Sequence, residues 1–218
     1  MTEPDSAYGP QYFQTRFSFD RDRDLVWQEV CRYLQPRYIP GDSAILEIGA
    51  GYCHFINHIQ GRKRHALDVS PDLGQRAGAG VVAHVGSCSS LTMFGDSSLD
   101  VVFASNLFEH LTRDDLAATL REILRVLRAG GQLLVIQPNF AHCVREYFDD
   151  YTHLQVFTHV SLADRLTAAG FRIDRVLPRF LPFSMKSRLP KSRWLVRLYL
   201  HLPFRPLGAQ MLIVARKG

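Results

Sequence analysis

The sequence predicts an α/β fold in which helices cover both faces of a mostly parallel sheet. Short apolar runs alternate with helical segments along most of the chain, as parallel strands joined by helical crossovers require. The run at 133–136 (Leu-Leu-Val-Ile) is apolar at every position, so that strand needs cover on each side. The chain has 218 residues, which is the length of one domain.

The expected elements follow in order. A helix over 24–34 has apolar residues at steps of four, and Pro36, Pro40 and Gly41 are expected to end it. Strands are expected at 44–48, 65–69, 81–85, 99–104, 133–136, 171–177 and 211–215. Further helices are expected at 55–59, after the helix start Ser70-Pro71-Asp72, at 114–127 and at 161–169. Gly130 and Gly131 are expected to cap the helix that ends at Leu127.

The composition indicates an ordinary globular protein with reduced thiols. Hydrophobic residues make up 46% of the chain and charged residues 22%, so a substantial core can form without staples. The four cysteines lie at wide spacings without a C-x-x-C pair, which favours neither a zinc site nor disulfides. There is no signal-peptide pattern and no apolar run of the roughly 20 residues that span a bilayer. We therefore expect a cytoplasmic protein.

The most informative stretch is 45–53, where an apolar strand runs into Glu-x-Gly-x-Gly (Glu47, Gly49, Gly51). Glycines allow a sharp turn and let backbone amides approach a ligand closely. Glu47 suits a cationic amino-acid ligand better than a phosphate. Asp68 ends the next strand, where an acid can accept both hydroxyls of a ribose. NAD-binding enzymes share that device, but they favour a third glycine where this chain has His54.

Together these features resemble the class I SAM-dependent methyltransferases (SAM, S-adenosylmethionine), in particular the small-molecule branch with type 11 domains. The resemblance covers about 45–170. It includes 85–88 (Val-Gly-Ser-Cys), the fourth strand and its exit at 99–111, and the turn at 124–131. It implies a Rossmann-like three-layer sandwich with a mostly parallel seven-stranded sheet whose last strand is antiparallel. It also implies SAM as the cofactor and S-adenosylhomocysteine as the product.

The same resemblance assigns the cofactor site. Glu47 and the two glycines would line the methionine end, Asp68 would hold the ribose, and Ser87 would lie beside the adenine. The residues expected to bind the cofactor are Glu47, Gly49, Gly51, Tyr52, Asp68, Val69, Ser87, Cys88, Asn106 and Leu107. Two positions depart from the family pattern, because Cys53 replaces the third glycine and Ser87 replaces an acid. These changes are expected to weaken SAM binding without abolishing it.

Candidate catalytic residues follow the fourth and fifth strands, because ligands of open α/β sheets bind beyond the carboxyl ends of the strands. His110, Asp150 and His153 are the candidates, since histidine titrates near neutral pH and suits proton abstraction. The alternative for His110 is that it is a common feature of the family at this place. A metal site from His142, Asp149 and His153 lacks a recognised spacing, so no metal is predicted.

The predicted function is methyl transfer to a small molecule, at oxygen, such as a natural product, sugar, quinone or lipid-linked precursor. The net charge of +5 motivates an RNA methyltransferase as an alternative. The stretch 105–108 (Ser-Asn-Leu-Phe) lacks the Pro-Pro-Tyr pattern of nucleic-acid N-methyltransferases, so a nucleic-acid partner is disfavoured. The departures at Cys53 and Ser87 motivate a second alternative, a non-catalytic SAM-binding partner subunit.

The whole chain, 1–218, is predicted to be a single domain with four parts. These are an N-terminal lid and helix (1–41), a SAM-binding core (42–180), a basic apolar cap (181–207) and a final strand (208–218). In the cap, Arg193, Arg197 and His201 recur at steps of four and form one basic stripe. The favoured interpretation is that this segment packs on the sheet or on a second subunit, which leaves a homodimer open. The alternative is peripheral membrane contact through 186–204, in which the stripe meets anionic lipid heads.

Overall fold

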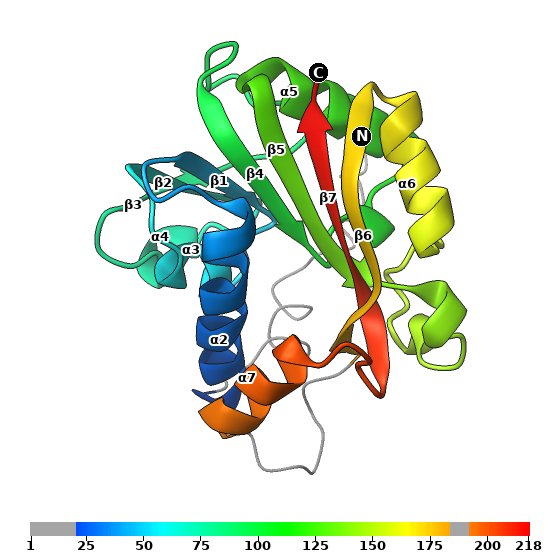
Figure 1. Cartoon of the computed structure of the whole chain (residues 1–218). Helices are drawn as coiled ribbons and strands as arrows, with labels where there is room; N and C mark the ends of the chain where they lie inside the picture. The colour runs from blue at the N-terminus through cyan, green and yellow to red at the C-terminus, as the bar shows by residue number, and fades with distance from the viewer. Residues whose placement is uncertain (1–20, 184–191) are drawn as a thin grey trace.

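The computed structural model describes residues 21–183 and 192–218. One sheet contains all seven strands found in these ranges, in the order β3-β2-β1-β4-β5-β7-β6 (Figure 1). The strands are β1 (Ala44–Ile48), β2 (Lys63–Asp68), β3 (Val81–Val85), β4 (Leu99–Ser105), β5 (Leu127–Pro138), β6 (Phe171–Pro182) and β7 (Gly208–Lys217). Strands β1 to β5 pair in parallel, and β7 is antiparallel to both β5 and β6. The predicted sheet, including its antiparallel last strand, is confirmed.

Helices cover both faces of the sheet, as the apolar strands require. They are α2 (Arg21–Tyr38), α3 (His54–His58), α4 (Leu73–Arg76), α5 (Arg113–Val126), α6 (His159–Ala168) and α7 (Arg193–His201). Buried residues of α5 and α6, such as Leu120 and Leu166, share one core cluster with the sheet. Buried residues of α2, α3, α4 and α7 share the cluster on the opposite face (Figure 1). Side chains of β1 alternate between the two faces, with Leu46 in the first cluster and Ile45 in the second.

Two expected helix ends are wrong. Helix α2 continues through Pro36 to Tyr38. A proline near the last turn removes only one helical hydrogen bond, and the Gln35 side chain donates to the Ile39 carbonyl beyond the end (2.8 Å). Gly130 and Gly131 do not cap α5, because Leu127 already has extended backbone angles and begins β5. The glycines instead lie in an irregular stretch where the β4–β5 pairing shifts register.

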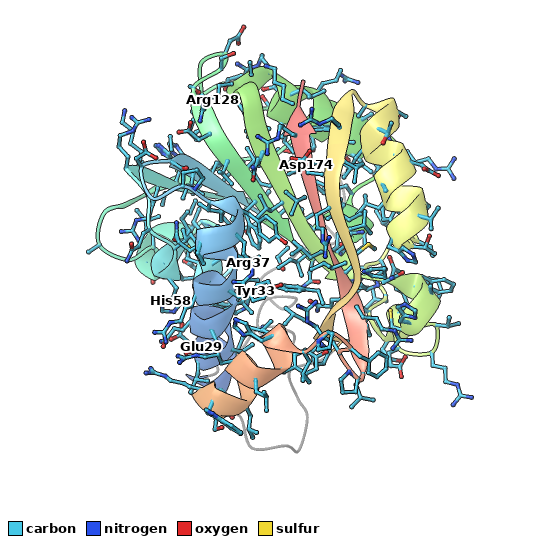
Figure 2. All side chains as sticks on the ribbon, viewed as in Figure 1. Glu29, Tyr33, Arg37, His58, Arg128 and Asp174 are labelled. Carbon is cyan, nitrogen blue, oxygen red and sulfur yellow. The ribbon has the colours of Figure 1, made fainter. Side chains whose placement is uncertain are left out.

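The basic stripe of α7 faces α2. Arg197 pairs with Glu29 (3.0 Å), whose side chain is 1% exposed, and Arg193 donates to the Gln28 side chain (2.8 Å). Figure 2 shows Glu29 on the part of α2 that lies beside α7. The exposed residues of α7 include apolar side chains as well, such as Trp194 at 67% exposure. The contacts with α2 agree with the interpretation that this segment packs within the protein.

Other sequence expectations lie outside the described residues or are untouched by the structure. The predicted N-terminal lid falls within 1–20, and the basic residues Lys186, Arg188 and Lys191 fall within 184–191, so both lie outside the described ranges. Within the described ranges, no helix has the length and apolar character needed to cross a membrane.

Candidate functional site

The loops that carry the predicted cofactor residues meet at the carboxyl edge of the sheet. Strand β1 pairs with β2 on one side and with β4 on the other, so the chain order reverses at this strand. Such a switch point in an open α/β sheet is where ligands bind. The loop after β1 is tied to β2, because the Ala50 amide donates to the Leu67 carbonyl (3.0 Å).

The turn after β1 has a left-handed backbone at three positions. The φ angles are 64° at Gly49, 49° at Gly51 and 58° at Cys53. Cys53 thus keeps the conformation that a glycine adopts most readily, although its side chain is fully buried. A Cβ atom at Gly49 would lie 2.9 Å from the Leu107 side chain, whereas one at Gly51 would meet nothing within 4 Å. Gly51 therefore leaves open space against the backbone, and Gly49 is needed for the close packing of two loops.

Asp68 holds the loops after β1 and β2 together. Its Oδ2 accepts a hydrogen bond from the Gly51 amide (2.8 Å) and its Oδ1 accepts one from the Ser70 amide (2.9 Å). Each carboxylate oxygen can accept more than one hydrogen bond. The carboxylate therefore keeps acceptor capacity for ligand hydroxyls while it fixes the glycine turn.

Glu47 lies on the face of the sheet that α2 and α3 cover. Its Oε2 accepts a hydrogen bond from the Ile56 amide in the first turn of α3 (2.9 Å). Burial raises the pKa of Glu47 to about 8, the Ile56 hydrogen bond opposes this shift, and the charge of Asp68 adds to it. The contact ties β1 to α3, so Glu47 fixes the turn between them. The expectation that it lines the methionine end of a ligand stays a prediction.

The remaining predicted cofactor residues lie around this edge. Tyr52 stacks on His54, and Arg76 lies over the Tyr52 ring at 4.6 Å. Ser87 bonds to the Ser89 hydroxyl (2.7 Å). Cys88 is instead buried and accepts from Thr119. The other members are Val69, which is 55% exposed, Asn106, whose amide donates to the Ile136 carbonyl, and Leu107, which packs on Gly49.

The three predicted catalytic residues come together beside the exit of β4. The Thr152 hydroxyl donates to Asp150 Oδ1 (2.6 Å) and lies 3.0 Å from His110 Nδ1. The Thr152 carbonyl lies 3.2 Å from the same nitrogen. A carbonyl can only accept, so Nδ1 carries the ring proton and the lone pair of the neutral ring is at Nε2. The rings of His110 and His153 are 4.8 Å apart.

Sequence reasoning missed Glu109, which is fully buried under this cluster. Neither of its carboxylate oxygens has a hydrogen-bond partner of good geometry among the described residues. Burial raises the pKa of Glu109 to about 8, with the charge of Asp150 adding to the effect and its own backbone amide opposing it. Its carbonyl accepts from the amides of Leu154 and Gln155, 2.8 and 3.1 Å away, so the same residue anchors the loop that carries His153. Only its position before His110 hinted at a role.

The metal set considered from the sequence does not assemble. His142 stacks on His159 and lies 3.2 Å from an Arg179 nitrogen. In the part of the chain that the structure describes, the His, Cys, Asp and Glu side chains close enough to share an ion are Glu109, His110 and His153. The order of residues in the chain gave no sign that Glu109 replaces His142 and Asp149.

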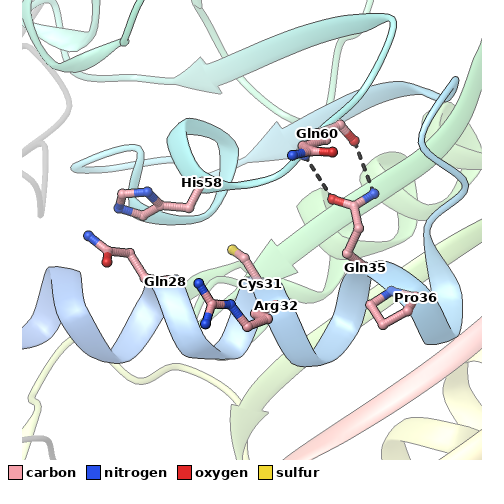
Figure 3. Close-up of a pocket in the computed structure, with 7 residues that line it drawn as sticks. All are labelled: Gln28, Cys31, Arg32, Gln35, Pro36, His58 and Gln60. Atoms are coloured by element: carbon pink, nitrogen blue, oxygen red, sulfur yellow. Dashed lines mark hydrogen bonds between the residues drawn. The ribbon is translucent and has the colours of Figure 1, made fainter. Parts of the chain in front are cut away.

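A separate surface hollow lies between α2 and the end of α3. Gln28, Cys31 and His58 line it, and Gln35 closes one side by bonding twice to the backbone of Gln60, at 2.8 and 3.1 Å (Figure 3). These residues come from a helix face and a helix end, away from the loops that follow the strands. The hollow therefore brings none of the predicted site residues together.

Comparisons with known proteins agree with this geometry. Residues 46–135 match the family described as a methyltransferase domain. No curated protein sequence matches the chain. Among solved structures, a SAM-dependent methyltransferase from Archaeoglobus fulgidus is 21% identical, with a TM-score of 0.64 over 87% of this chain and 94% of that one. One from Mesorhizobium loti is 15% identical, with a TM-score of 0.58 over 81% and 92%.

A further similar structure comes from a complex of the Haloferax volcanii Trm112 methyltransferase activator with a methyltransferase. It is 18% identical, with a TM-score of 0.68 over 90% of this chain and 93% of that chain. At these identities the structural matches show the fold, which is the one found in the class of SAM-dependent methyltransferases. The family match places a methyltransferase domain at residues 46–135.

The residues present fit SAM, the cofactor that this class implies. The space beside Gly51 is open, because a Cβ atom there would meet nothing within 4 Å. Any residue other than glycine would place a Cβ atom in this space and would be strained by the left-handed backbone. Asp68 stands beside that space with acceptor capacity left. Asn106 is exposed at the neighbouring exit of β4. An open cradle with a carboxylate at its rim suits a ligand with a ribose and a cationic end.

Proposed function

We propose that the protein is a SAM-dependent methyltransferase that methylates a small molecule at an oxygen atom. The observation that carries the proposal is the orientation of His110. Its ring proton is held at Nδ1 by Thr152. His110 also lies on the same loop as Leu107, whose side chain packs on Gly49 of the cofactor turn. A group able to take a proton therefore lies on the loop after β4, which packs against the cofactor turn after β1.

In this mechanism the described residues bind, orient and move a proton. When bound, SAM supplies a methyl group on a positively charged sulfur, which leaves as neutral S-adenosylhomocysteine. Asp68 accepts hydrogen bonds from the ribose hydroxyls, and the Gly51 turn gives the ligand close access to the backbone. His110 takes the proton that the acceptor hydroxyl loses, which is general base catalysis. Asp150 is a positioning residue, because it acts on His110 through Thr152.

The donor half of the proposal is tested by calorimetric titration. SAM and S-adenosylhomocysteine are expected to bind the wild-type protein, and NAD is not. Asp68→Ala is expected to weaken SAM binding by the ~1–3 kcal/mol that hydrogen bonds to a charged group contribute. Asp72→Ala is the matched control, because its exposed carboxylate lies just past the loop. Failure of SAM to bind the folded wild-type protein would refute the proposal.

The acceptor half is tested with SAM that carries a ¹³C-labelled methyl group. The protein is incubated with a small-molecule extract and, separately, with total RNA, and the methyl signals of the products are recorded by NMR. A signal at the shift of an O-methyl group in the small-molecule fraction supports the proposal. A signal at the shift of an N- or C-methyl group, or one confined to RNA, contradicts it.

Contacts with a protein partner, a membrane or a second copy of the chain stay predictions. The similar structure solved with a Trm112 activator gives a reason to test for a protein partner, which would also suit the role of a non-catalytic subunit. Peripheral membrane contact would use the exposed apolar side chains of α7, such as Trp194, beside arginines that also contact α2. Failure to bind anionic vesicles at low salt would remove that prediction. A homodimer is tested by the molecular mass in solution.

A further inference from the structure

The proposed function, in which His110 is the base, assigns no role to the side chain of Glu109. It is 0% exposed, and neither oxygen has a hydrogen-bond partner of good geometry among the described residues. The hydrogen bonds from the amides of Leu154 and Gln155 go to its backbone carbonyl and do not involve the carboxyl group. A buried carboxylate is strongly disfavoured unless it is paired or coordinates a cation, and without such a partner the group keeps its proton. No ion pair in the described ranges includes Glu109.

Two imidazoles stand next to this carboxylate. One ligand atom each from Glu109, His110 and His153 lie within 4.8 Å of one another. Ligand atoms around a bound ion at 2.0–2.2 Å are roughly 3–4 Å apart. Small side-chain rotations therefore suffice to close the set. Both histidines are half-buried while Glu109 is fully buried, so the histidines are the more accessible part of the set.

The surroundings of His110 resemble the support that metal-binding histidines need. A ligating imidazole donates its second N–H to a carbonyl or other acceptor, which fixes the tautomer and turns the lone pair toward the ion. Here Nδ1 has two acceptors, the carbonyl and the hydroxyl of Thr152, at 3.2 and 3.0 Å. The Thr152 hydroxyl is itself held by Asp150 (2.6 Å). This places the lone pair at Nε2.

We propose that Glu109, His110 and His153 bind a divalent transition-metal ion. Two imidazoles and one carboxylate suit Zn²⁺ or Mn²⁺, whereas Mg²⁺ and Ca²⁺ favour sites made of oxygen. Three protein ligands leave a coordination position for a further ligand, as in a catalytic rather than a structural site. The open position would take an acceptor hydroxyl and lower its pKa, so that its proton is lost to solvent and not to His110, whose Nε2 lone pair would then bind the ion. That role rests on the proposed function, whereas binding of the ion does not.

The test is calorimetric titration of the metal-stripped full chain with ZnCl₂, MnCl₂ and MgCl₂. One equivalent of Zn²⁺ or Mn²⁺ is expected to bind, with Mg²⁺ at least tenfold weaker. Replacing bound Zn²⁺ by Co²⁺ is expected to give the visible absorption of a coordinated ion. Glu109→Gln and His153→Ala are each expected to weaken binding at least tenfold. Circular dichroism checks that both variants fold, and the half-buried His153 is the safer substitution.

His84→Ala is the matched control. His84 belongs to another close pair of histidines, with its Nε2 3.1 Å from His65 Nδ1, so this variant is expected to bind Zn²⁺ as the wild type does. Absence of Zn²⁺ and Mn²⁺ binding, or loss of binding in His84→Ala but not in His153→Ala, would overturn the proposal. Titration with SAM on the same preparations separates the two proposals. SAM binding without metal binding leaves the methyltransferase standing, and metal binding without SAM binding leaves only the metal site.

Discussion

Glu47→Gln is expected to make folding stability less sensitive to pH. The carboxyl group of Glu47 is buried, and burial raises its pKa to about 8. In the unfolded chain a glutamate titrates near its ordinary value of about 4.3. Between these two values the folded protein holds a proton that the unfolded chain has lost. The stabilising contribution is therefore full below the unfolded pKa and is lost as the pH rises through 8.

The size of the effect follows from proton linkage. Within this window the free energy of unfolding falls by about 1.4 kcal/mol per pH unit because of this one group. Glutamine cannot titrate, and its side-chain oxygen can still accept from the Ile56 amide, 2.9 Å away in the native protein. The difference between the variant and the wild type is expected to grow with pH at about that slope and to level off above 8. Several histidines also titrate in this range, but their contributions cancel in the difference.

The assay is urea denaturation of both proteins at five pH values from 5 to 9. Glu122→Gln is the control, because a hydrogen bond from Arg125 lowers the pKa of Glu122. Its contribution is lost only as the pH falls, below the window in question. The difference for Glu122→Gln is therefore expected to stay flat from pH 5 to 8. A flat difference for Glu47→Gln over the same range would refute the reasoning.

Three further predictions concern the turn, the core and a helix cap. Gly49→Ala is expected to lower stability more than Gly51→Ala in urea denaturation, because only its Cβ would meet a neighbour, at 2.9 Å. Gly51→Ala is expected to weaken SAM binding instead. Equal losses of stability in the two variants would contradict the expected difference between Gly49 and Gly51. Phe55→Ala is expected to cost about 3–5 kcal/mol, because the ring is buried and stacks on Phe103 at 3.7 Å; thermal unfolding measures it, and a loss under 1 kcal/mol would count against it. Thr112→Ala is expected to cost ~1 kcal/mol, because its hydroxyl accepts from the first turn of α5 (3.1 Å); no change in stability would exclude the cap.

The sequence by itself determined the sheet and the turn that follows its first strand. The spacing of apolar residues within a short segment predicts whether that segment forms a strand or a helix. The alternation of strands and helices could therefore be predicted from the sequence. The Glu-x-Gly-x-Gly turn was readable too, because the left-handed backbone at Gly49 and Gly51 is a local property of glycine. The ends of two helices were predicted wrongly. The extension of α2 through Pro36 depends on how much one lost hydrogen bond costs near a terminus, which a residue type does not reveal.

Only the tertiary structure decided which side chains meet. His110 and Thr152 are 42 positions apart and share a hydrogen bond, and the lone pair at Nε2 follows from that contact. The buried carboxyl group of Glu109 and the orientation of the α7 arginines toward α2 were likewise decided by packing. The physical reason is that strand order, loop closure and the burial of charge are set by contacts between distant segments. The spacing of residues within one segment does not predict those contacts.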